Sequence, residues 1–400
     1  MKSFFYSVAC LLYVATSFSQ QKVAPSYTTI THTIASTAIG EDRIIDIYIP
    51  PAYKNSPDRV FPVVYVLDGQ EYFLQGVAYQ DMLRFRDKSP AFIVVGIRTN
   101  RRKRRRLFYQ ESSKFTRFLN KELIPYIDQT YRTFKEKERV FFGWEMAAGL
   151  GFEISQTHPS LFSAYVLASP SHLRRRMRRL QEASLHSTTP FLLVTAGAEE
   201  TWIQKDSLLT TAVNKRKKWR FAVYDREDHY TTPFKSMHEG LSDYFGDYKP
   251  IRKQSLDAYD AYGGVVALRR YYKHRGERYG LPIDIHRETQ HFLIYNAMAE
   301  DRMLRFEHYI SEFKNYIPSI TRAFWIHRYA KFYAKHHKNN KAIALFELGL
   351  ERFPKSTLLL EAVGDYYKGL QKKNQATHYY KKALDIDPNL SSVLAKMKNQ

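Results

Sequence analysis

The stretch that decides the fold is VFFGWEMAAG, from Val140 to Gly149. It begins as a short apolar run of β-type residues that ends in Gly143, and small residues follow from Met146 onwards. This order predicts a buried strand, a tight turn and the start of a helix. Glu145 stands in the turn, where hydrolytic enzymes of one large fold place a nucleophilic Ser. The chain therefore has either an unusual catalytic group or the frame of an enzyme without its nucleophile.

Apolar β-rich runs recur on both sides of this stretch. They comprise residues 60–67, 91–97, 139–143, 162–168, 190–196 and 219–224, and they follow a polar–apolar alternation over 27–50 that predicts an antiparallel hairpin. Segments 112–131 and 145–158 carry apolar residues at the three- and four-residue spacing of amphipathic helices. Continuous apolar strands that alternate with helices predict an α/β domain whose mostly parallel sheet is covered on both faces. We place this domain at residues 21–248.

The C-terminal third is helical in pattern and contains a repeat. Six residues match the spacing of a tetratricopeptide unit, namely Gly364, Tyr367, Ala376, Tyr380, Ala383 and Pro388, and the positions 34 residues earlier hold Ala330, Tyr333, Ala342, Phe346, Gly349 and Pro354. Small residues fall where paired helices must approach closely, and aromatic residues fall where they interdigitate. We expect a linker helix in 249–286 and an all-α, tetratricopeptide-like tail over 287–400, with a more degenerate pair near 287–318.

The first twenty residues, MKSFFYSVACLLYVATSFSQ, combine one Lys, a short apolar stretch and a small polar end. This pattern predicts a secretory signal peptide over 1–20, because the apolar stretch is too short to span a membrane. A lipoprotein anchor at Cys10 is the alternative. Cys10 is the single cysteine, so the mature protein would hold no disulfide, thiolate metal site or cysteine nucleophile. We expect an exported protein of the bacterial periplasm or cell surface, with no metal and no cofactor.

The formal net charge of +22 is partly concentrated in two runs, RRKRRR at 101–106 and RRRMRR at 174–179. In an exported protein such runs favour anionic lipid or polysaccharide, or an acidic substrate, and we expect no nucleic acid. The anion-binding candidates of the first run are Arg101, Arg102, Arg104, Arg105 and Arg106. A solvated basic loop and helix face without a dedicated ligand is the alternative.

Acidic and basic candidates follow the turn in a definite order. The turn itself, GWEMA at 143–147, departs from the pattern G-x-S-x-G at its third and fifth positions. A later apolar run ends at Glu199 and Glu200, and His229 lies in the loop after the next run. In an α/β-hydrolase an acid and then a His follow the nucleophile along the chain. The sequence supplies every element of that order except the nucleophile.

Residues 27–248 resemble the putative esterase family, the α/β-hydrolases that include esterase D and the enterochelin esterases. The matching segments, besides the turn, are VVYVLDGQEYF (63–73), VVGIRTN (94–100), HPSLFSAYVLASPS (158–171), TAGAEE (195–200) and EDHYTTP (227–233). A tetratricopeptide tail is a known companion of this domain in bacterial members. The resemblance covers most of the mature chain.

The resemblance implies roles for particular side chains. His229 matches the catalytic base, Glu199 or Glu200 matches the acid that orients this base, and Glu145 matches the nucleophile position. Asp residues within 225–228 are the alternative acids. The loss of Ser from position 145 puts acyl-enzyme chemistry in doubt.

The resemblance also implies an oxyanion hole and a pocket residue. The backbone N–H groups of Gly69 or Gln70, and of Met146, match the oxyanion hole. Trp144, which precedes the turn residue where the family has a His, would stack on a substrate or plug the cleft.

Three roles are open to Glu145. It could attack an sp³ carbon, with His229 then activating water, because attack on an ester would give a mixed anhydride from a poor nucleophile. It could be a general acid or base beside His229. It could also fill the oxyanion hole or pair with protonated His229, which would leave a binding module. Ser169 and Ser171 follow a different apolar run and are expected to cap the next helix.

The expected protein is an exported hydrolase-type chain with weak or absent esterase activity, a pseudoenzyme with a binding or scaffold role. The alternative is an active hydrolase that uses Glu145 and His229 on esters or sp³-carbon substrates. The expected partners are a small-molecule ester or envelope-derived ligand and a protein or peptide held by the helical tail.

Overall fold

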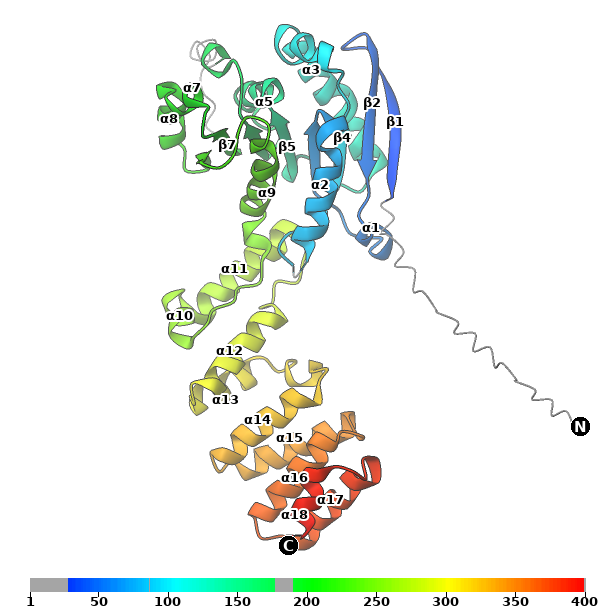
Figure 1. Ribbon diagram of the computed structural model, residues 1–400, viewed down its shortest axis with the longest axis vertical. Helices are drawn as coiled ribbons and strands as arrows, with labels where there is room; N and C mark the ends of the chain where they lie inside the picture. The colour runs from blue at the N-terminus through cyan, green and yellow to red at the C-terminus, as the bar shows by residue number, and fades with distance from the viewer. Residues whose placement is uncertain (1–27, 86, 177–189, 399–400) are drawn as a thin grey trace, which may run out of the picture. The chain divides into compact units, whose positions relative to one another are not determined.

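The computed structural model describes residues 28–85, 87–176 and 190–398. The expected signal peptide and the second half of the RRRMRR run lie outside these residues. The contacts divide the chain into two compact units. The sheet unit takes residues up to Gln80 and Ala91–Gly240, and the helical unit takes Asp81–Pro90 and the residues from Leu241 onwards (Figure 1).

Eight strands in the described part of the sheet unit form one sheet in the order β1-β2-β4-β3-β5-β6-β7-β8. They are β1 (Thr29–Ser36), β2 (Glu41–Tyr48), β3 (Val63–Leu67), β4 (Ile93–Ile97), β5 (Arg139–Trp144), β6 (Ala164–Ala168), β7 (Phe191–Gly197) and β8 (Trp219–Tyr224). The β1–β2 and β2–β4 pairs are antiparallel, and the pairs from β4 to β8 are parallel. The hairpin and the mostly parallel sheet that the sequence predicts are therefore confirmed.

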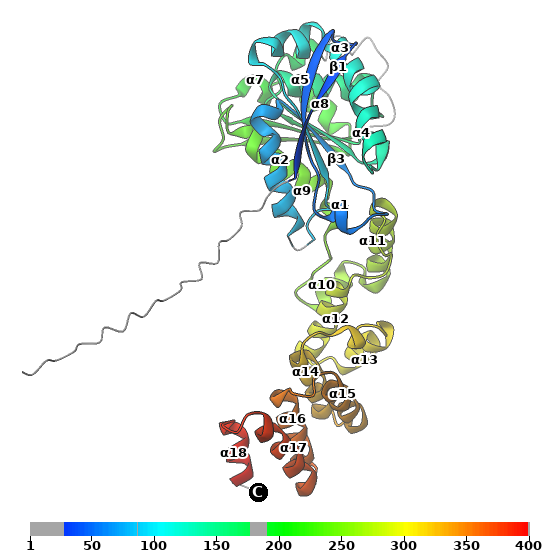
Figure 2. The same cartoon turned by 90° about the vertical axis from the view of Figure 1, so that its right-hand side faces the viewer.

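Helices cover both faces of this sheet (Figure 2). Within the described residues, the helices that lie wholly or mainly in the sheet unit are α1 (Ala52–Asn55), α2 (Gly69–Arg84), α3 (Ser112–Phe118), α4 (Ile124–Thr130), α5 (Met146–Thr157), α7 (Thr201–Gln204), α8 (Ser207–Asn214) and α9 (Thr232–Tyr244), with shorter turns η1 (Arg101–Lys103), η2 (Arg106–Gln110), η3 (Leu119–Leu123) and η4 (Lys135–Lys137). The helix expected over 112–131 is α3, η3 and α4 in succession, because η3 is a π-type turn.

The strand residues alternate between two cores because both faces of the sheet are packed. On one face, Gly76 of α2 lies against Val66 and Val94, and Gly240 of α9 lies against Val166. On the other face, Tyr65 and its neighbours join a cluster with apolar residues of α3, η3, α4 and α5. Every residue of β3, β4 and β6 is buried. This explains why these strands are continuous apolar runs in the sequence.

The helical unit is built from consecutive helices. They are α10 (Leu256–Ala261), α11 (Gly264–Tyr279), α12 (Arg287–Ala299), α13 (Met303–Glu312), α14 (Ala323–Lys335), α15 (Asn339–Arg352), α16 (Thr357–Gly369), α17 (Lys373–Ile386) and α18 (Ser391–Lys398), with turns η5 (Gly246–Tyr248) and η6 (Ile317–Ser319). The segment 249–286, expected to hold one linker helix, holds two. Gly263 breaks it, because its φ of 106° belongs to the left-handed region that glycine tolerates.

Small residues stand at the closest approaches between the C-terminal helices. A Cβ on Gly364 of α16 would lie 2.4 Å from the Tyr380 ring of α17, and one on Gly349 of α15 would lie 2.9 Å from Ile326 of α14. Three of the periodic positions, Gly349, Gly364 and Tyr380, thus lie where neighbouring helices contact each other. No helix in the described residues combines the length and the apolar composition needed to cross a bilayer.

The β5–α5 junction depends on a glycine. A Cβ on Gly143 would lie 2.7 Å from the carbonyl carbon of Ala147 and 2.9 Å from the Ala148 nitrogen. These are backbone atoms, which cannot rotate away as a side chain can. Residue 143 therefore sets how closely the strand and the following helix can pack.

We predict that Gly143→Ala lowers the free energy of unfolding by about 1–3 kcal/mol, as overpacking of a fixed site does. Gly76→Ala is the matched control, because its Cβ would meet a Val94 methyl at 3.1 Å and Ala favours the helix. Urea unfolding followed by circular dichroism measures both. Equal stability of the two variants would contradict the tight junction.

Candidate active site

Glu145 occupies a strained turn between β5 and α5. Its φ and ψ are 54° and −111°, which a non-glycine residue rarely adopts. The turn is held because the Glu145 N–H donates to the Ala168 carbonyl at 2.9 Å, while the Glu145 carbonyl accepts from the N–H groups of Gly149 at 2.9 Å and Ser171 at 3.0 Å. A sharp strand-to-helix turn of this kind presents the nucleophile of α/β-hydrolases.

The carboxylate of Glu145 binds Arg104. Its Oε2 accepts from Arg104 Nη1 at 2.5 Å, and Arg104 Nη2 donates to the Trp144 carbonyl at 3.1 Å. Within the described residues, the recorded ion pair of this carboxylate is therefore with Arg104 rather than with His229. The run RRKRRR thus places the Arg104 guanidinium inside the site. Its planar group carries several N–H donors and can bind more than one acceptor at once.

Arg104 also binds Asp68, the residue that follows β3. Arg104 Nε lies 3.2 and 3.1 Å from the two Asp68 oxygens, and the Asp68 side chain is 2% exposed. Burial raises the pKa of Asp68 to about 6, and the nearby Glu145 charge adds to the rise, although Arg104 opposes it. One half-buried guanidinium therefore compensates two carboxylates at the same end of the sheet.

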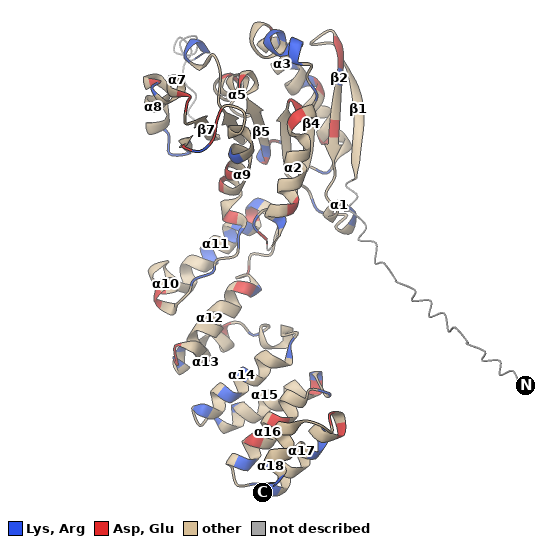
Figure 3. Cartoon of the chain, in the orientation of Figure 1, with Lys and Arg blue, Asp and Glu red and all other residues tan. Residues whose placement is uncertain are grey.

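Other members of the first Arg run also contact acidic residues, which Figure 3 marks in red. Arg101 Nη2 lies 3.0 Å from Glu71 Oε1, and Arg106 Nη2 lies 3.0 Å from Glu41 Oε2. Arg102 and Arg105 are exposed. The run is therefore a mixture of internal counter-ions and solvent-facing charges rather than a uniform basic surface.

The second Arg run also sends a charge inward. Arg176 is 1% exposed, and its guanidinium pairs with Glu153 of α5. The structure thus places this residue in the packing of the sheet unit, away from the solvated helix face expected from the sequence.

His229 is held by Glu200. The His229 Nδ1 and Glu200 Oε1 atoms lie 2.7 Å apart, and Glu200 is fully buried. Glu200 Oε2 also accepts from Ser169 Oγ at 2.6 Å and from the Gly197 N–H at 2.7 Å. Glu199 contacts only the backbone of this histidine, accepting from the His229 N–H at 3.3 Å. Of the two candidate acids, Glu200 is the one that touches the ring.

The other polar candidates have structural contacts. Asp228 Oδ1 accepts from the N–H groups of Tyr230 and Thr231, each at 2.8 Å, and so stabilises the turn that carries His229. Ser169 was expected to cap a helix, but its hydroxyl donates to Glu200 instead. Its φ of 48° turns the chain at the end of β6. Asp228 therefore does not replace Glu200 as the acid.

Hydrogen bonding shifts the pKa of both partners in the His229–Glu200 pair. The bond to Glu200 raises the pKa of His229 above its ordinary 6.5, against the effect of burial. Burial alone would raise the pKa of Glu200, but the bonds from His229, Ser169 and Gly197 lower it below 4.5. The pair can therefore hold a proton on the imidazole and a negative charge on the carboxylate.

Trp144 connects the turn with the histidine loop. Its Nε1–H donates to the His229 carbonyl at 2.9 Å, and the two ring centroids lie 4.9 Å apart. The Arg104 guanidinium carbon lies 5.0 Å from the centre of the indole. Trp144 thus fixes the backbone of His229 from one side while a cation covers the ring.

Two helices begin where the oxyanion hole is expected. Gly69 is the first residue of α2, and Met146 is the first residue of α5, so their N–H groups have no acceptor within their helices. A Cβ on Gly69 would lie 2.6 Å from the Gly96 carbonyl carbon of β4, which explains the glycine there. The Gln70 side chain accepts from the Thr99 N–H at 2.8 Å and ties α2 to the loop after β4.

A pocket of about 340 Å³ lies beside these groups. It is lined by Asp68, Gln70, Glu71, Tyr72, Arg101, Arg104, Trp144, Tyr230 and Phe234. Aromatic side chains thus form part of its wall, and charged groups of both signs form the rest. Within the described residues, no group of three or more His, Cys, Asp or Glu side chains is arranged to hold a metal ion.

The sequence pattern did not identify two of these groups, Arg104 as an internal counter-ion and Ser169 as a donor to Glu200. Arg104 stands in the same basic run as the exposed Arg102 and Arg105, and no local pattern distinguishes it from them. The position of Asp68 directly after an apolar run was a usable signal, because a carboxylate at that edge of the sheet requires a cation.

We predict that Arg104→Ala lowers the free energy of unfolding by about 3–5 kcal/mol at pH 7.5, because it leaves the buried Asp68 and the half-buried Glu145 without a cation. Arg101→Ala is the matched control. It removes an ion pair of the same turn whose Arg side chain is 81% exposed, and should cost under about 1 kcal/mol. Chemical unfolding of both variants checks this. A loss for Arg104→Ala no larger than the control would contradict the buried counter-ion.

We predict that Glu200→Gln lowers the pKa of the His229 ring, measured by NMR titration and assigned with His229→Asn. The His229 contribution to stability is complete below pH 6.5 and is lost as pH rises through its raised pKa. The Glu200 contribution is present above pH 4.5 and is lost as pH falls through its lowered pKa. Relative to the wild type, Glu200→Gln should therefore lose most stability between pH 4.5 and pH 6.5. Glu199→Gln is the control, and a larger shift there would contradict the pairing.

The family match lies over the sheet unit. The model of a family described as putative esterase matches residues 36–239, about half of the chain. YjcH, an uncharacterized protein of Bacillus subtilis strain 168, is 26% identical over 142 residues, which are 34% of this chain and 58% of that protein. The chain thus spans less than two thirds of the length of this curated relative.

Two solved structures have a similar fold. An IroE-like serine hydrolase from Shewanella oneidensis is 20% identical with a TM-score of 0.51, over 72% of this chain and 98% of that one. An uncharacterised protein from Capnocytophaga ochracea is 16% identical with a TM-score of 0.53, over 92% of this chain and all of that one. The sheet, the turn at Glu145 and the family match lead to one conclusion: the chain has an α/β-hydrolase fold and belongs to the putative esterase family.

Proposed function

We propose that this protein is an exported pseudoenzyme of its family, which binds a small ester or envelope-derived ligand with weak or absent ester hydrolysis. The observation that carries the proposal is the Glu145 carboxylate, bound to Arg104 at 2.5 Å in the turn that presents the nucleophile. A carboxylate that attacked an ester would form a mixed anhydride. The guanidinium weakens such an attack further because its positive charge lowers the nucleophilicity of the carboxylate.

The rest of the site supports ligand binding. The first N–H groups of α2 and α5 are donors suited to a carbonyl oxygen, whether or not the carbonyl carbon is attacked. The pocket of about 340 Å³ adds Trp144, Tyr72 and Phe234 as apolar surface and Arg101 at its margin. An acyl group with a carbonyl oxygen matches this combination of apolar wall and donors.

A working hydrolase is the second candidate, favoured by the intact His229–Glu200 pair. Its imidazole has an acid partner at 2.7 Å, as a general base requires. In this version Glu145 would attack an sp³ carbon, the leaving group would depart, and His229 would activate water to release the product. Arg104 would first have to leave the carboxylate.

The remaining parts of the proposal concern location and partners. Export rests on the sequence of residues 1–20. The helical pairs α14–α15 and α16–α17 carry the 34-residue period, and we assign them to tetratricopeptide-like repeats that bind a protein or peptide. Arg102 and Arg105 are the exposed residues of the first run that remain candidates for anionic lipid or polysaccharide.

We predict that the mature wild-type chain gives no turnover of p-nitrophenyl acetate above Glu145→Ala, whereas Glu145→Ser gains at least about tenfold. The gain is expected because a positioned general base accelerates such reactions by about 10²–10⁴-fold, and His229 is already held by Glu200. Hydrolysis is followed by p-nitrophenolate absorbance, and a haloalkane is assayed beside it by halide release.

The double variant Glu145→Ser with His229→Asn is the control and should lose the gain. Wild-type turnover of either substrate that Glu145→Ala abolishes would overturn the pseudoenzyme proposal and establish the second candidate. Loss of binding of an unreactive ester analogue on Trp144→Ala, measured by calorimetry, would support the ligand role, and undiminished binding would contradict it.

A further inference from the structure

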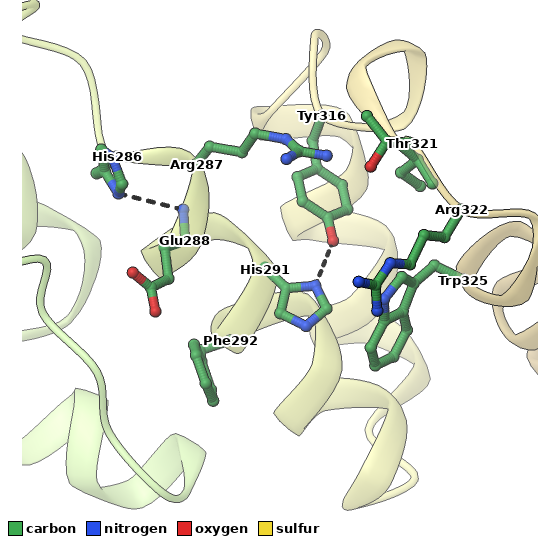
Figure 4. Close-up of a pocket in the computed structure, with 10 residues that line it drawn as sticks. His286, Arg287, Glu288, His291, Phe292, Tyr316, Thr321, Arg322 and Trp325 are labelled. Carbon is green, nitrogen blue, oxygen red and sulfur yellow. Dashed lines mark hydrogen bonds between the residues drawn. The ribbon is translucent and has the colours of Figure 1, made fainter. Parts of the chain in front are cut away.

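A second pocket, of about 530 Å³, lies within the helical unit. It is formed where α12 begins, beside η6 and the start of α14, and Figure 4 shows its lining side chains. In that view the side chains of Arg287 and Arg322 extend towards each other from opposite sides of the pocket. Neither the hydrolase fold nor the periodic repeat positions account for this site.

The charge of the pocket is positive. Arg287 is fixed by donating through Nε to Ser319 Oγ at 3.0 Å and through Nη2 to the Ser319 carbonyl at 2.6 Å. The side chain of Arg322 has no hydrogen-bond or ion-pair partner among the described residues, although its carbonyl accepts from the Trp325 N–H at 3.2 Å. The acidic lining residue, Glu288, is neutralised by an ion pair with Arg252. Two cations thus face the pocket, one preorganised and one available.

The walls between the two cations are aromatic and ordered. The Tyr316 hydroxyl lies 2.5 Å from His291 Nδ1 and 3.0 Å from the Tyr329 hydroxyl, so the imidazole is held in place. The Trp325 ring stands edge-on to His291 with centroids 4.5 Å apart. Burial and then the Arg287 charge lower the pKa of His291, which keeps this ring neutral at pH 7. An apolar group can therefore pack against these rings within the pocket.

We propose that this pocket binds a carboxylate attached to an apolar or aromatic group. The unpartnered guanidinium of Arg322 can donate two parallel hydrogen bonds to a planar carboxylate, and the charge of Arg287 adds to the attraction. The aromatic wall of His291, Trp325 and Phe292 suits the apolar substituent. The volume admits a whole side chain with its carboxyl group, which is more than a bare ion needs. A free organic acid and the C-terminal residue of a peptide share this chemistry.

Calorimetric titration of the mature full-length chain tests the site with N-acetyl-phenylalanine as the probe. Binding should weaken at least about tenfold in Arg322→Ala, because one charged hydrogen-bonding partner is lost. Arg322 is exposed and otherwise unpartnered, so the variant should keep its fold, which circular dichroism checks. Arg328→Ala is the matched control, since Arg328 lies 5.5 Å from the same Trp325 ring but does not line the pocket. It should change the affinity by less than about twofold.

Three further probes separate the sources and the chemistry. N-acetyl-phenylalaninamide lacks the carboxylate and should bind at least about tenfold more weakly. Phenylacetate binding as tightly as N-acetyl-phenylalanine would support a free acid, and tighter binding of a tripeptide ending in Phe would support a peptide. Tighter binding of inorganic phosphate, equal binding of the amide, an unchanged Arg322→Ala, or no binding at millimolar probe would overturn the proposal. None of these results depends on residue 145.

Discussion

The position of Arg104 between Asp68 and Glu145 is the interaction on which the candidate site depends. The two carboxylates follow β3 and β5, which are parallel neighbours, so both lie at the same edge of the sheet. Two negative charges taken out of water at that edge would cost several kcal/mol per ion without a cation. A guanidinium has enough donors to reach both groups and the Trp144 carbonyl together. The turn can carry a carboxylate because the loop after β4 supplies its counter-ion.

The base and its acid are assembled from other elements. Glu200 follows β7 and is held by Ser169 after β6 and by the Gly197 N–H, while His229 comes from the loop after β8. None of these contacts involves the side chain at position 145. The groups that orient the His229 imidazole are therefore different from the side chain at position 145, which would be the nucleophile. A substitution at position 145 can therefore remove the nucleophile and leave the His229–Glu200 pair in place.

The sequence predicted the sheet because its strands are buried on both faces and so read as continuous apolar runs. It placed the β5–α5 turn and the order of Glu200 and His229, because the order of residues can be read from the sequence without knowing which residues are in contact. It could not separate Arg104 from Arg102 and Arg105, because the irregular turns of η1 and η2 decide which side chain faces inward. The hydrogen bond between Ser169 and Glu200 forms because β6 and β7 are neighbours in the sheet. The two residues are 31 positions apart in the sequence, so no local pattern predicts their contact.

The indole of Trp144 has a consequence for motion. Loops that carry catalytic groups usually open at low free energy, because few buried contacts hold them. The loop around His229 is instead attached to the last residue of a central strand by the bond from the Trp144 nitrogen and by ring contact. It can open locally only if it gives up those contacts or disturbs β5. Any local opening that moves the His229 backbone therefore carries the cost of breaking its link to the central strand.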